Sequence, residues 1–195
     1  MSLRVAPLPQ ATIAARLDDL ASLRIRVFRD WPYLYDGDLD YERRYLRPYA
    51  ESAGAVVVGA WDGARLVGAA TGAPLEDHAA AFGAPFAASG RRIEDYYYCA
   101  ESVLLPDYRG QGAGRAFFEH REAKAREVGR PNICFCAVVR PADHPARPAE
   151  YEPLNPFWRR LGYAPAEALT ARFSWRDVGD TAETEKTMQF WEKRL

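Results

Sequence analysis

The spacing of apolar residues along the chain predicts four helices. Ile13, Leu17, Leu20, Ile25 and Phe28 recur at intervals that place most of them on one face of a helix. Other stretches keep a similar period or end in a glycine, which is typical of a helix C-terminus. We expect helices over residues 11–28, 40–49, 115–128 and 155–163.

Seven shorter segments are apolar throughout or alternate polar and apolar residues, as β-strands do. Asp62-Gly63 lies between two of them and is a strong hairpin signal. We expect strands over residues 3–8, 55–61, 65–72, 96–105, 132–140, 172–178 and 184–193. Residues 75–92 are rich in Ala, Gly and Pro without a clear period. This segment is expected to be a long connection with one helical turn at most, which could serve as a lid.

Residues 103–115 combine a strand end, a glycine-rich loop and a helix start. Pro106 ends the strand, because proline has no N–H for the ladder. Glycine allows the backbone to approach an anion closely, and the free N–H groups of the next helical turn would point at it. Arg109 and Arg115 add positive charge at the two ends of the loop. Three glycines alternate with other residues there: Gly110, Gly112 and Gly114.

Several kinds of glycine loop could explain this stretch. A Walker A loop is excluded, because no Gly-Lys-Ser/Thr follows the required gap. The dinucleotide fingerprint fits poorly, since its last spacing is missing and the loop lies in the middle of the chain. A turn that binds nothing is the structural alternative. A loop that holds a phosphate group of a larger ligand fits the whole run from strand to helix.

Composition places the chain among ordinary globular proteins. Its 195 residues are 48% hydrophobic and 27% charged, with a formal net charge of −1, so nothing pulls it toward nucleic acid or a membrane. We expect one domain over residues 1–195 in the cytoplasm, because no signal-peptide shape opens the chain. Cys99, Cys134 and Cys136 are too few for a disulfide framework, and no metal site is expected.

The motif Arg109-x-x-Gly112-x-Gly114, preceded by Pro106-Asp107-Tyr108, resembles the pyrophosphate loop of the GNAT superfamily of N-acetyltransferases. The order of expected elements is similar to that of the family, and Leu161-Gly162-Tyr163 resembles its segment after the fifth strand. The resemblance implies an α/β (α+β) fold with a mixed, mostly antiparallel sheet of about seven strands. Helices would flank this sheet, and it would splay between the fourth and fifth strands.

The same resemblance implies acetyl-CoA as co-substrate. The backbone of the fourth strand would pair with the pantetheine arm, and loop amides would hold the pyrophosphate. The expected cofactor-binding residues are Ser102, Val103, Leu104, Arg109, Gly110, Gln111, Gly112, Ala113, Gly114 and Arg115.

Two roles that the family usually fills are vacant here. Many relatives use a tyrosine as the acid four residues before the Leu-Gly-Tyr glycine, where this chain has Trp158. The fifth strand carries no carboxylate. Glu101 is therefore the expected base, because burial in an apolar strand makes a carboxylate more basic. A salt bridge to an arginine such as Arg140, or a solvent-facing position, is its structural alternative. Tyr97 is the second catalytic candidate, and a core aromatic is its alternative.

The loop between the first two helices is expected to wall the acceptor site, as in relatives. An aromatic and acidic wall suits a cationic amine, although these side chains could instead form a satellite core. The expected substrate-binding residues are Trp31, Tyr33, Tyr35, Asp36 and Trp158.

We therefore expect acetyl transfer to a primary amine by direct attack in a ternary complex. A small-molecule acceptor is favoured over a protein, and homodimer formation is left open. The vacant acid and base positions keep a catalytically weak acyl-CoA-binding regulatory domain as the alternative. A protein that binds a nucleotide phosphate at the glycine loop is a third interpretation.

Overall fold

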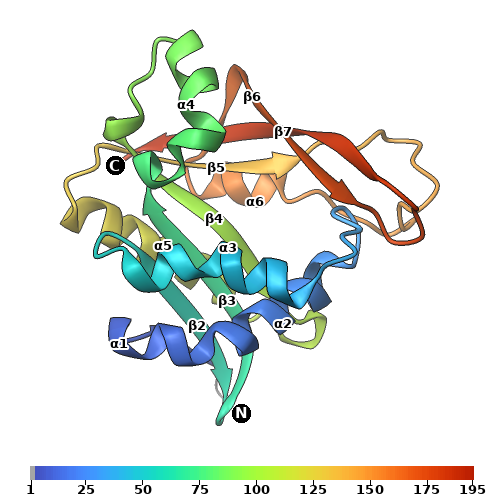
Figure 1. The fold of residues 1–195 in the computed structure, drawn as a ribbon, viewed down its shortest axis with the longest axis horizontal. Helices are drawn as coiled ribbons and strands as arrows, with labels where there is room; N and C mark the ends of the chain where they lie inside the picture. Colours follow the sequence, from blue (N-terminus) through green and yellow to red (C-terminus); the bar gives the residue numbers. More distant parts are fainter. Residues whose placement is uncertain (1–2) are drawn as a thin grey trace.

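The computed structural model describes residues 3–195, which form one mixed sheet with helices on both faces (Figure 1). The strands are β1 (Arg4–Pro7), β2 (Val56–Asp62), β3 (Arg65–Pro74), β4 (Tyr96–Leu104), β5 (Asn132–Val138), β6 (Ala164–Arg176) and β7 (Glu183–Arg194). The helices are α1 (Gln10–Ile13), α2 (Leu17–Phe28), α3 (Leu39–Glu51), α4 (Ala79–Ala88), α5 (Ala113–Glu127) and α6 (Asn155–Arg160).

The expected fold class is confirmed by the sheet. Its strand order is β1-β2-β3-β4-β5-β7-β6, and every neighbouring pair is antiparallel except β4 and β5. Those two strands pair only over Tyr96–Tyr98 and Asn132–Cys134, although both run on beyond. The sheet is thus splayed between them, as expected.

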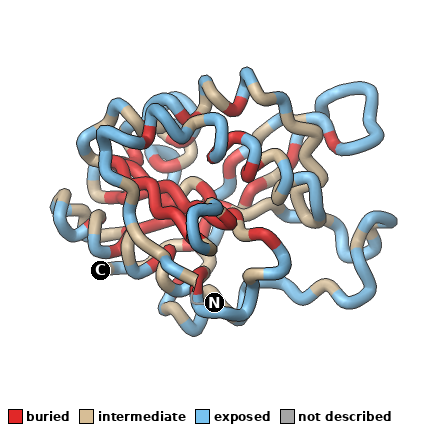
Figure 2. Tube along the Cα trace, turned by 90° about the horizontal axis from the view of Figure 1, so that it is seen from below, coloured by how far each residue is buried: buried red, intermediate tan, exposed pale blue. Residues whose placement is uncertain are grey.

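Two clusters of buried side chains pack against the sheet. The buried residues follow the central strands (Figure 2). In Figure 1, α2 and α3 lie in front of the sheet, and α5 and α6 lie behind it. The larger core cluster includes Leu20, Leu46, Val58 and Phe117. The smaller cluster lies beneath α4.

Residues 75–92 are a packed helical segment, so the expected long connection is wrong. A 3-10 turn over Leu75–His78 leads into α4, whose Phe82 and Phe86 are 2% and 0% exposed. Their rings meet the Phe190 ring edge-on at 5.2 and 5.3 Å. The two phenylalanines are four residues apart, and the residues around them are small. The helical spacing of large apolar residues therefore depends on these two side chains alone, which is too few to predict a helix.

Two element boundaries also differ from expectation. Residues 11–28 hold α1, a 3-10 turn over Ala14–Arg16, and α2 rather than one helix. Strand β6 begins at Ala164 instead of residue 172. Its first part contains Ala168 at a φ of 61° and a shift of register between Pro165 and Thr170. A bulge of this kind breaks the alternation that predicts a strand.

Candidate functional site

The open end of the splay exposes β4 in the middle of the sheet. Ser102 is exposed although it lies on a central strand, while its neighbours Glu101 and Val103 are buried. Beyond Tyr98, the pairing of β4 with β5 has ended. An extended ligand could therefore lie along this part of β4 and take up its free backbone groups.

The glycine loop beside this opening offers a row of backbone donors. Gly110 and Gly112 have φ values of 77° and 86°, a conformation that L side chains rarely adopt. Gly112 caps α5 at its N-terminus. Within residues 3–195, no amide N–H from residue 110 to residue 115 donates a hydrogen bond to the protein. Together with the helix dipole, these free donors suit a phosphate group.

The polar side chains of this loop bond to the protein itself, unlike its backbone amides. Arg109 Nε donates to the carbonyl of Leu104 at 3.3 Å, which turns this arginine back toward β4. Gln111 donates to the Asp107 carbonyl at 3.3 Å. Arg115 lies on the exposed face of α5, 3.9 Å from the Glu119 carboxylate. Both arginines are exposed, so positive charge lies at the rim of the loop.

A buried arginine of α5 holds the middle of β4 in place. Arg121 is 1% exposed and donates to the carbonyl of Glu101 at 2.9 Å and to Ser102 Oγ at 2.9 Å. It also donates to the Thr71 carbonyl at 3.4 Å. Arg121 was not among the residues expected at the site. Its position one helical turn after the buried Phe117 was the available signal.

A register shift in β4 decides which side chains meet at the site. Ser102 pairs with Ala70, whereas Cys99 pairs with Gly72, so β4 has one extra residue between these pairs. Glu101 therefore points toward α2 and α3, where Arg24 and Tyr45 contact it. Without this bulge, Glu101 would share a face with Cys99.

Glu101 belongs to a buried ion cluster with Arg24 and Glu42. Arg24 Nη1 lies 2.5 Å from Glu101 Oε2, and its Nε donates to Glu42 Oε2. The exposed fraction of the side chain is 2% for Glu101, 10% for Arg24 and 0% for Glu42. Glu101 Oε1 and Glu42 Oε1 are buried without a hydrogen-bond partner in residues 3–195. The cluster thus holds two carboxylates and one guanidinium, with an acceptor atom free on each carboxylate.

Glu101 pairs with Arg24. The salt bridge that the sequence suggested as the structural alternative is therefore present, but not with Arg140. Arg24 follows Leu20 and precedes Phe28 at four-residue steps, on the stripe of α2 that faces the core. That spacing could have identified it. Tyr45 of α3 completes the cluster by donating its hydroxyl proton to Glu101 Oε2 at 3.3 Å.

Tyr97 does not share a site with Glu101, contrary to the expectation that both are catalytic. Its side chain is on the α5 face of the sheet, next to Arg121 at Gly72. It is 0% exposed, and its hydroxyl donates to the Gly54 carbonyl at 3.1 Å. Tyr97 is therefore a core aromatic residue, which was the alternative to a catalytic role. The register shift between residues 99 and 102 separates it from the site.

The loop over residues 29–38 turns its tyrosines inward. The Tyr33 ring packs 4.5 Å from Phe28 and 6.1 Å from Trp175. Burial raises the pKa of Tyr33, and the nearby Cys136 and Glu101 groups add to the shift. Burial also raises the pKa of Tyr35, with the Glu42 carboxylate adding to it. These hydroxyls therefore stay protonated beside the ion cluster.

Trp31 and Asp36 lie on the outer side of this loop. Trp31 packs against His144 at 5.0 Å and Tyr151 at 5.8 Å, and its Nε1 is buried without a partner in residues 3–195. Asp36 pairs with Arg29 at 3.2 Å and with Arg176 at 2.6 Å. The structure thus brings Tyr33 near Glu101 and Tyr35 beside Glu42 of the same cluster, while Trp31 and Asp36 make their contacts outside it.

Arg140 and Asp177 clamp this loop to the end of the sheet. Arg140 donates to the carbonyls of Pro32 at 2.9 Å and Tyr33 at 2.7 Å. Its guanidinium also donates a hydrogen bond to each oxygen of the Asp177 carboxylate. Lys186 approaches Asp177 at 3.0 Å. Burial opposes ionisation of Asp177, but hydrogen bonds from Arg140 and Lys186 outweigh it and hold its pKa below the usual value.

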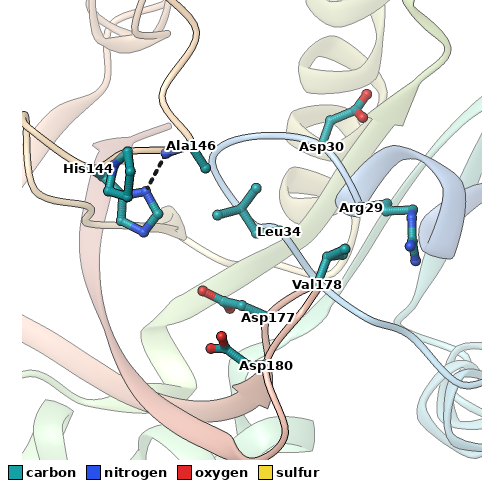
Figure 3. A pocket seen from close by; sticks show the side chains of 9 residues that line it. Arg29, Asp30, Leu34, His144, Ala146, Asp177, Val178 and Asp180 are labelled. Atoms are coloured by element: carbon teal, nitrogen blue, oxygen red, sulfur yellow. Dashed lines mark hydrogen bonds between the residues drawn. The ribbon is translucent and has the colours of Figure 1, made fainter.

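An open hollow of about 570 Å³ lies outside this clamp. Figure 3 shows His144 on one side of it and Leu34, Asp177 and Asp180 on the other. His144 Nδ1 accepts the Ala146 amide proton at 3.1 Å, which fixes the ring against the wall. Asp30 and Arg29 also line the hollow, so carboxylates outnumber basic side chains on its rim.

Trp158 in α6 packs on the sheet near the opening. Its ring lies 4.9 Å from Phe135 and 5.1 Å from Trp191, edge-on to both. An indole has no acidic proton for a leaving thiolate. The three cysteines are free and buried, and burial raises their pKa, so none supplies a thiolate.

Two further surveys of residues 3–195 bear on other classes of site. No group of three or more His, Cys, Asp or Glu side chains is arranged to hold a metal ion. None of the helices in this part of the chain has the length and apolar character needed to cross a membrane.

Comparison with known families gives one match. The family model described as "Acetyltransferase (GNAT) family" matches residues 20–163, which include the ion cluster, the glycine loop and α6. No curated protein sequence matches the chain.

Many solved structures share the fold at low sequence identity. A ribosomal-protein-alanine N-acetyltransferase from Brucella melitensis is 16% identical, with 98% of this chain and 99% of that chain covered and a TM-score of 0.61. A phosphinothricin acetyltransferase from Sinorhizobium meliloti, in complex with acetyl-CoA, is 13% identical, with 100% and 89% covered and a TM-score of 0.62. A putative acetyltransferase from Salmonella typhimurium, with its cofactor acetyl-CoA, is 14% identical, with 100% and 95% covered and a TM-score of 0.60.

Proposed function

Because the chain belongs to the GNAT family of acetyltransferases, we propose that it transfers the acetyl group of acetyl-CoA to the primary amine of a small molecule by direct attack in a ternary complex. The observation that carries this proposal is the position of Glu101. Its buried carboxylate stands at the bulge of β4, beside the open splay, with Oε1 free. A cytoplasmic location and a single catalytic domain over residues 1–195 are parts of the same proposal.

Acetyl-CoA fits the features on the other side of the splay. The free amides of residues 110–115 match a pyrophosphate, and the exposed stretch of β4 around Ser102 matches an extended pantetheine arm. The two similar structures that contain acetyl-CoA support this choice of co-substrate. Arg121 would act indirectly, by fixing the backbone of Glu101 and the Ser102 side chain.

Glu101 would act as the general base. A primary amine is protonated at neutral pH and has no lone pair for attack, so a proton must leave first. The free Oε1 of Glu101 can accept it. Arg24 and Tyr45 hold Oε2 on the other side, which fixes the orientation of the carboxylate. Orientation of this kind is a large part of what positioning contributes to catalysis.

The acceptor would enter past the loop over residues 29–38. Tyr33 and Tyr35 would line the inner end of its path and Trp31 and Asp36 the outer end, with the acidic hollow of Figure 3 at the entrance. Aromatic faces and carboxylates attract an ammonium group. Trp158 would cover the splay from the α6 side by packing on Phe135.

A thiol-release assay across a panel of primary amines tests this proposal. We expect thiol release from acetyl-CoA only with accepted amines, in step with the acetylated product. A thermal-shift comparison should show stabilisation by CoA and not by ATP, because no phosphate-binding lysine follows the glycines. If CoA stabilises the protein but no amine is acetylated, the chain is an acyl-CoA-binding regulatory domain instead.

A further inference from the structure

Glu101 lies too deep to return its proton to solvent by itself. Its side chain is 2% exposed. The overall change is R–NH₃⁺ + acetyl-S-CoA → R–NH–acetyl + CoA-SH + H⁺. One of the two protons lost by nitrogen ends on the sulfur, and the other must leave the protein in every turnover. While the acceptor and acetyl-CoA fill the splay, this buried base needs another path for the proton.

Side chains from α3 and the start of the α4 segment lead away from Glu101. Tyr45 donates to Glu101 Oε2 at 3.3 Å. Tyr49 follows one helical turn later, with its ring 6.2 Å from the Tyr45 ring. The Tyr49 hydroxyl lies 3.2 Å from His78 Nε2. His78 is partly exposed, so this row of groups ends at the surface.

The charges around this row keep its members able to pass a proton. Burial raises the pKa of Tyr45 and of Tyr49, and the Tyr45 hydroxyl adds to the shift of Tyr49, so neither ionises near neutral pH. Burial lowers the pKa of His78, while the Glu101 and Asp77 carboxylates act in the opposite direction. The rings of Tyr98 and Phe82 pack on the imidazole at 5.1 and 6.2 Å. His78 is therefore neutral near pH 7 and can accept a proton.

We propose that Tyr45, Tyr49 and His78 form a proton relay from Glu101 to solvent, a role that rests on the proposed function. Glu101 takes a proton from the acceptor's ammonium. The protonated carboxyl turns to present this proton to the Tyr45 oxygen, the Tyr45 hydroxyl turns to pass its own proton to Tyr49, and Tyr49 protonates His78 Nε2. His78 then releases the proton to water. The amine attacks the thioester carbon, the C–N bond forms, the C–S bond breaks, and the second proton of nitrogen goes to the sulfur.

Chemical rescue of a relay variant tests this role. We expect His78→Ala to lower kcat by about 10²-fold, the low end of what a positioned proton-transfer group contributes, with KM for acetyl-CoA unchanged. Imidazole should restore the rate. Pyrazole, a ring of the same shape that is far less basic, should fill the space without restoring it. Tyr49→Phe should show the same loss of kcat without rescue.

The control is Tyr96→Phe, which removes another buried hydroxyl that donates to a carboxylate, at Glu192, outside the relay. It should keep the wild-type kcat. The relay is overturned if His78→Ala keeps the wild-type rate, or if pyrazole restores activity as well as imidazole does. In the latter case His78 only supports the packing.

A titration of His78 by NMR gives a result that does not depend on turnover. Burial lowers the pKa of His78 and the charge of the Glu101 carboxylate opposes that shift, so Glu101→Gln should lower the pKa further. An unchanged His78 titration would contradict the electrostatic link between the two ends of the row, even in a protein that acetylates amines. Failure to acetylate any amine, with the titration shift present, would instead contradict the proposed function.

Discussion

Single residues at the start of α5 determine whether an anion can be held there. Gly112 has a φ of 86°, and a Cβ placed on it meets no atom within 4 Å. Space is therefore not the constraint. The constraint is the backbone conformation, which costs on the order of 1–3 kcal/mol for a side chain that is not glycine. Free amides of the loop depend on this conformation.

We expect Gly112→Val to abolish acetyl-CoA binding while the protein still folds. A β-branched residue resists a positive φ, so the loop would rearrange and its amides would turn away from the pyrophosphate. Isothermal titration with acetyl-CoA measures the effect. Gly83→Val, at an exposed-side helical glycine whose Cβ also meets no atom within 4 Å, serves as a size-matched control for binding. Unchanged affinity in folded Gly112→Val would refute the loop assignment.

Trp158 occupies the position at which many relatives carry the acid. We expect Trp158→Tyr to fold and to raise turnover, because a phenol can protonate the leaving thiolate and an indole cannot. The smaller ring can keep its contact with Phe135. Steady-state kinetics with an accepted amine, beside the melting temperature, give the answer. A lower rate in a folded variant would show that the indole shapes the pocket.

At the scale of elements, sequence patterns were sufficient where one face of an element is regularly apolar. The hairpin at Asp62-Gly63, the long helix after the glycine loop and the order of the strands followed from such patterns. The patterns failed where a bulge changes the period. In β6 a bulge hid the first half of the strand, and in β4 it placed Glu101 on the opposite face from Tyr97. Such shifts depend on pairing with a neighbouring strand, which one sequence does not display.

The helix α4 illustrates the consequence of such a missed element. It is a packed part of the core, so removal of one of its rings should reduce stability and leave chemistry intact. We expect Phe86→Ala to lower the free energy of unfolding by about 3–5 kcal/mol, as loss of a buried phenylalanine does. KM for acetyl-CoA should stay unchanged. Ala87→Ser, at an exposed position of the same helix, should shift stability by less than about 0.5 kcal/mol.

Denaturant unfolding measures both variants, and kinetics per folded molecule separate the two roles of α4. A raised KM in Phe86→Ala, with little loss of stability, would show that α4 moves over the site as a lid.

At the scale of the whole molecule, three separate elements bring the side chains of the ion cluster together at Glu101. Arg24 arrives on α2, Glu42 and Tyr45 on α3, and the carboxylate itself on the bulge of β4. In the proposed mechanism, the splay would bring the acetyl group to the same place from the other side. The sequence suggested Glu101 and the loop as candidates, because these lie in one continuous stretch. It did not reveal the ion cluster, because its members come from separate helices.

The pH–rate profile of Glu101→Gln, compared with that of Glu42→Gln, tests the central claim most directly. Both variants remove one carboxylate charge from the same buried cluster, so each should lose up to about 3 kcal/mol of stability, with Arg24 kept paired by the remaining carboxylate. Only Glu101 faces the acceptor in this account. Per folded molecule, Glu101→Gln should lose about 10²-fold in turnover and the rise of rate with pH, with acetyl-CoA affinity nearly unchanged. Glu42→Gln should keep the pH profile and most of the rate. Equal rates and profiles in the two variants would contradict the assignment of Glu101 as the base.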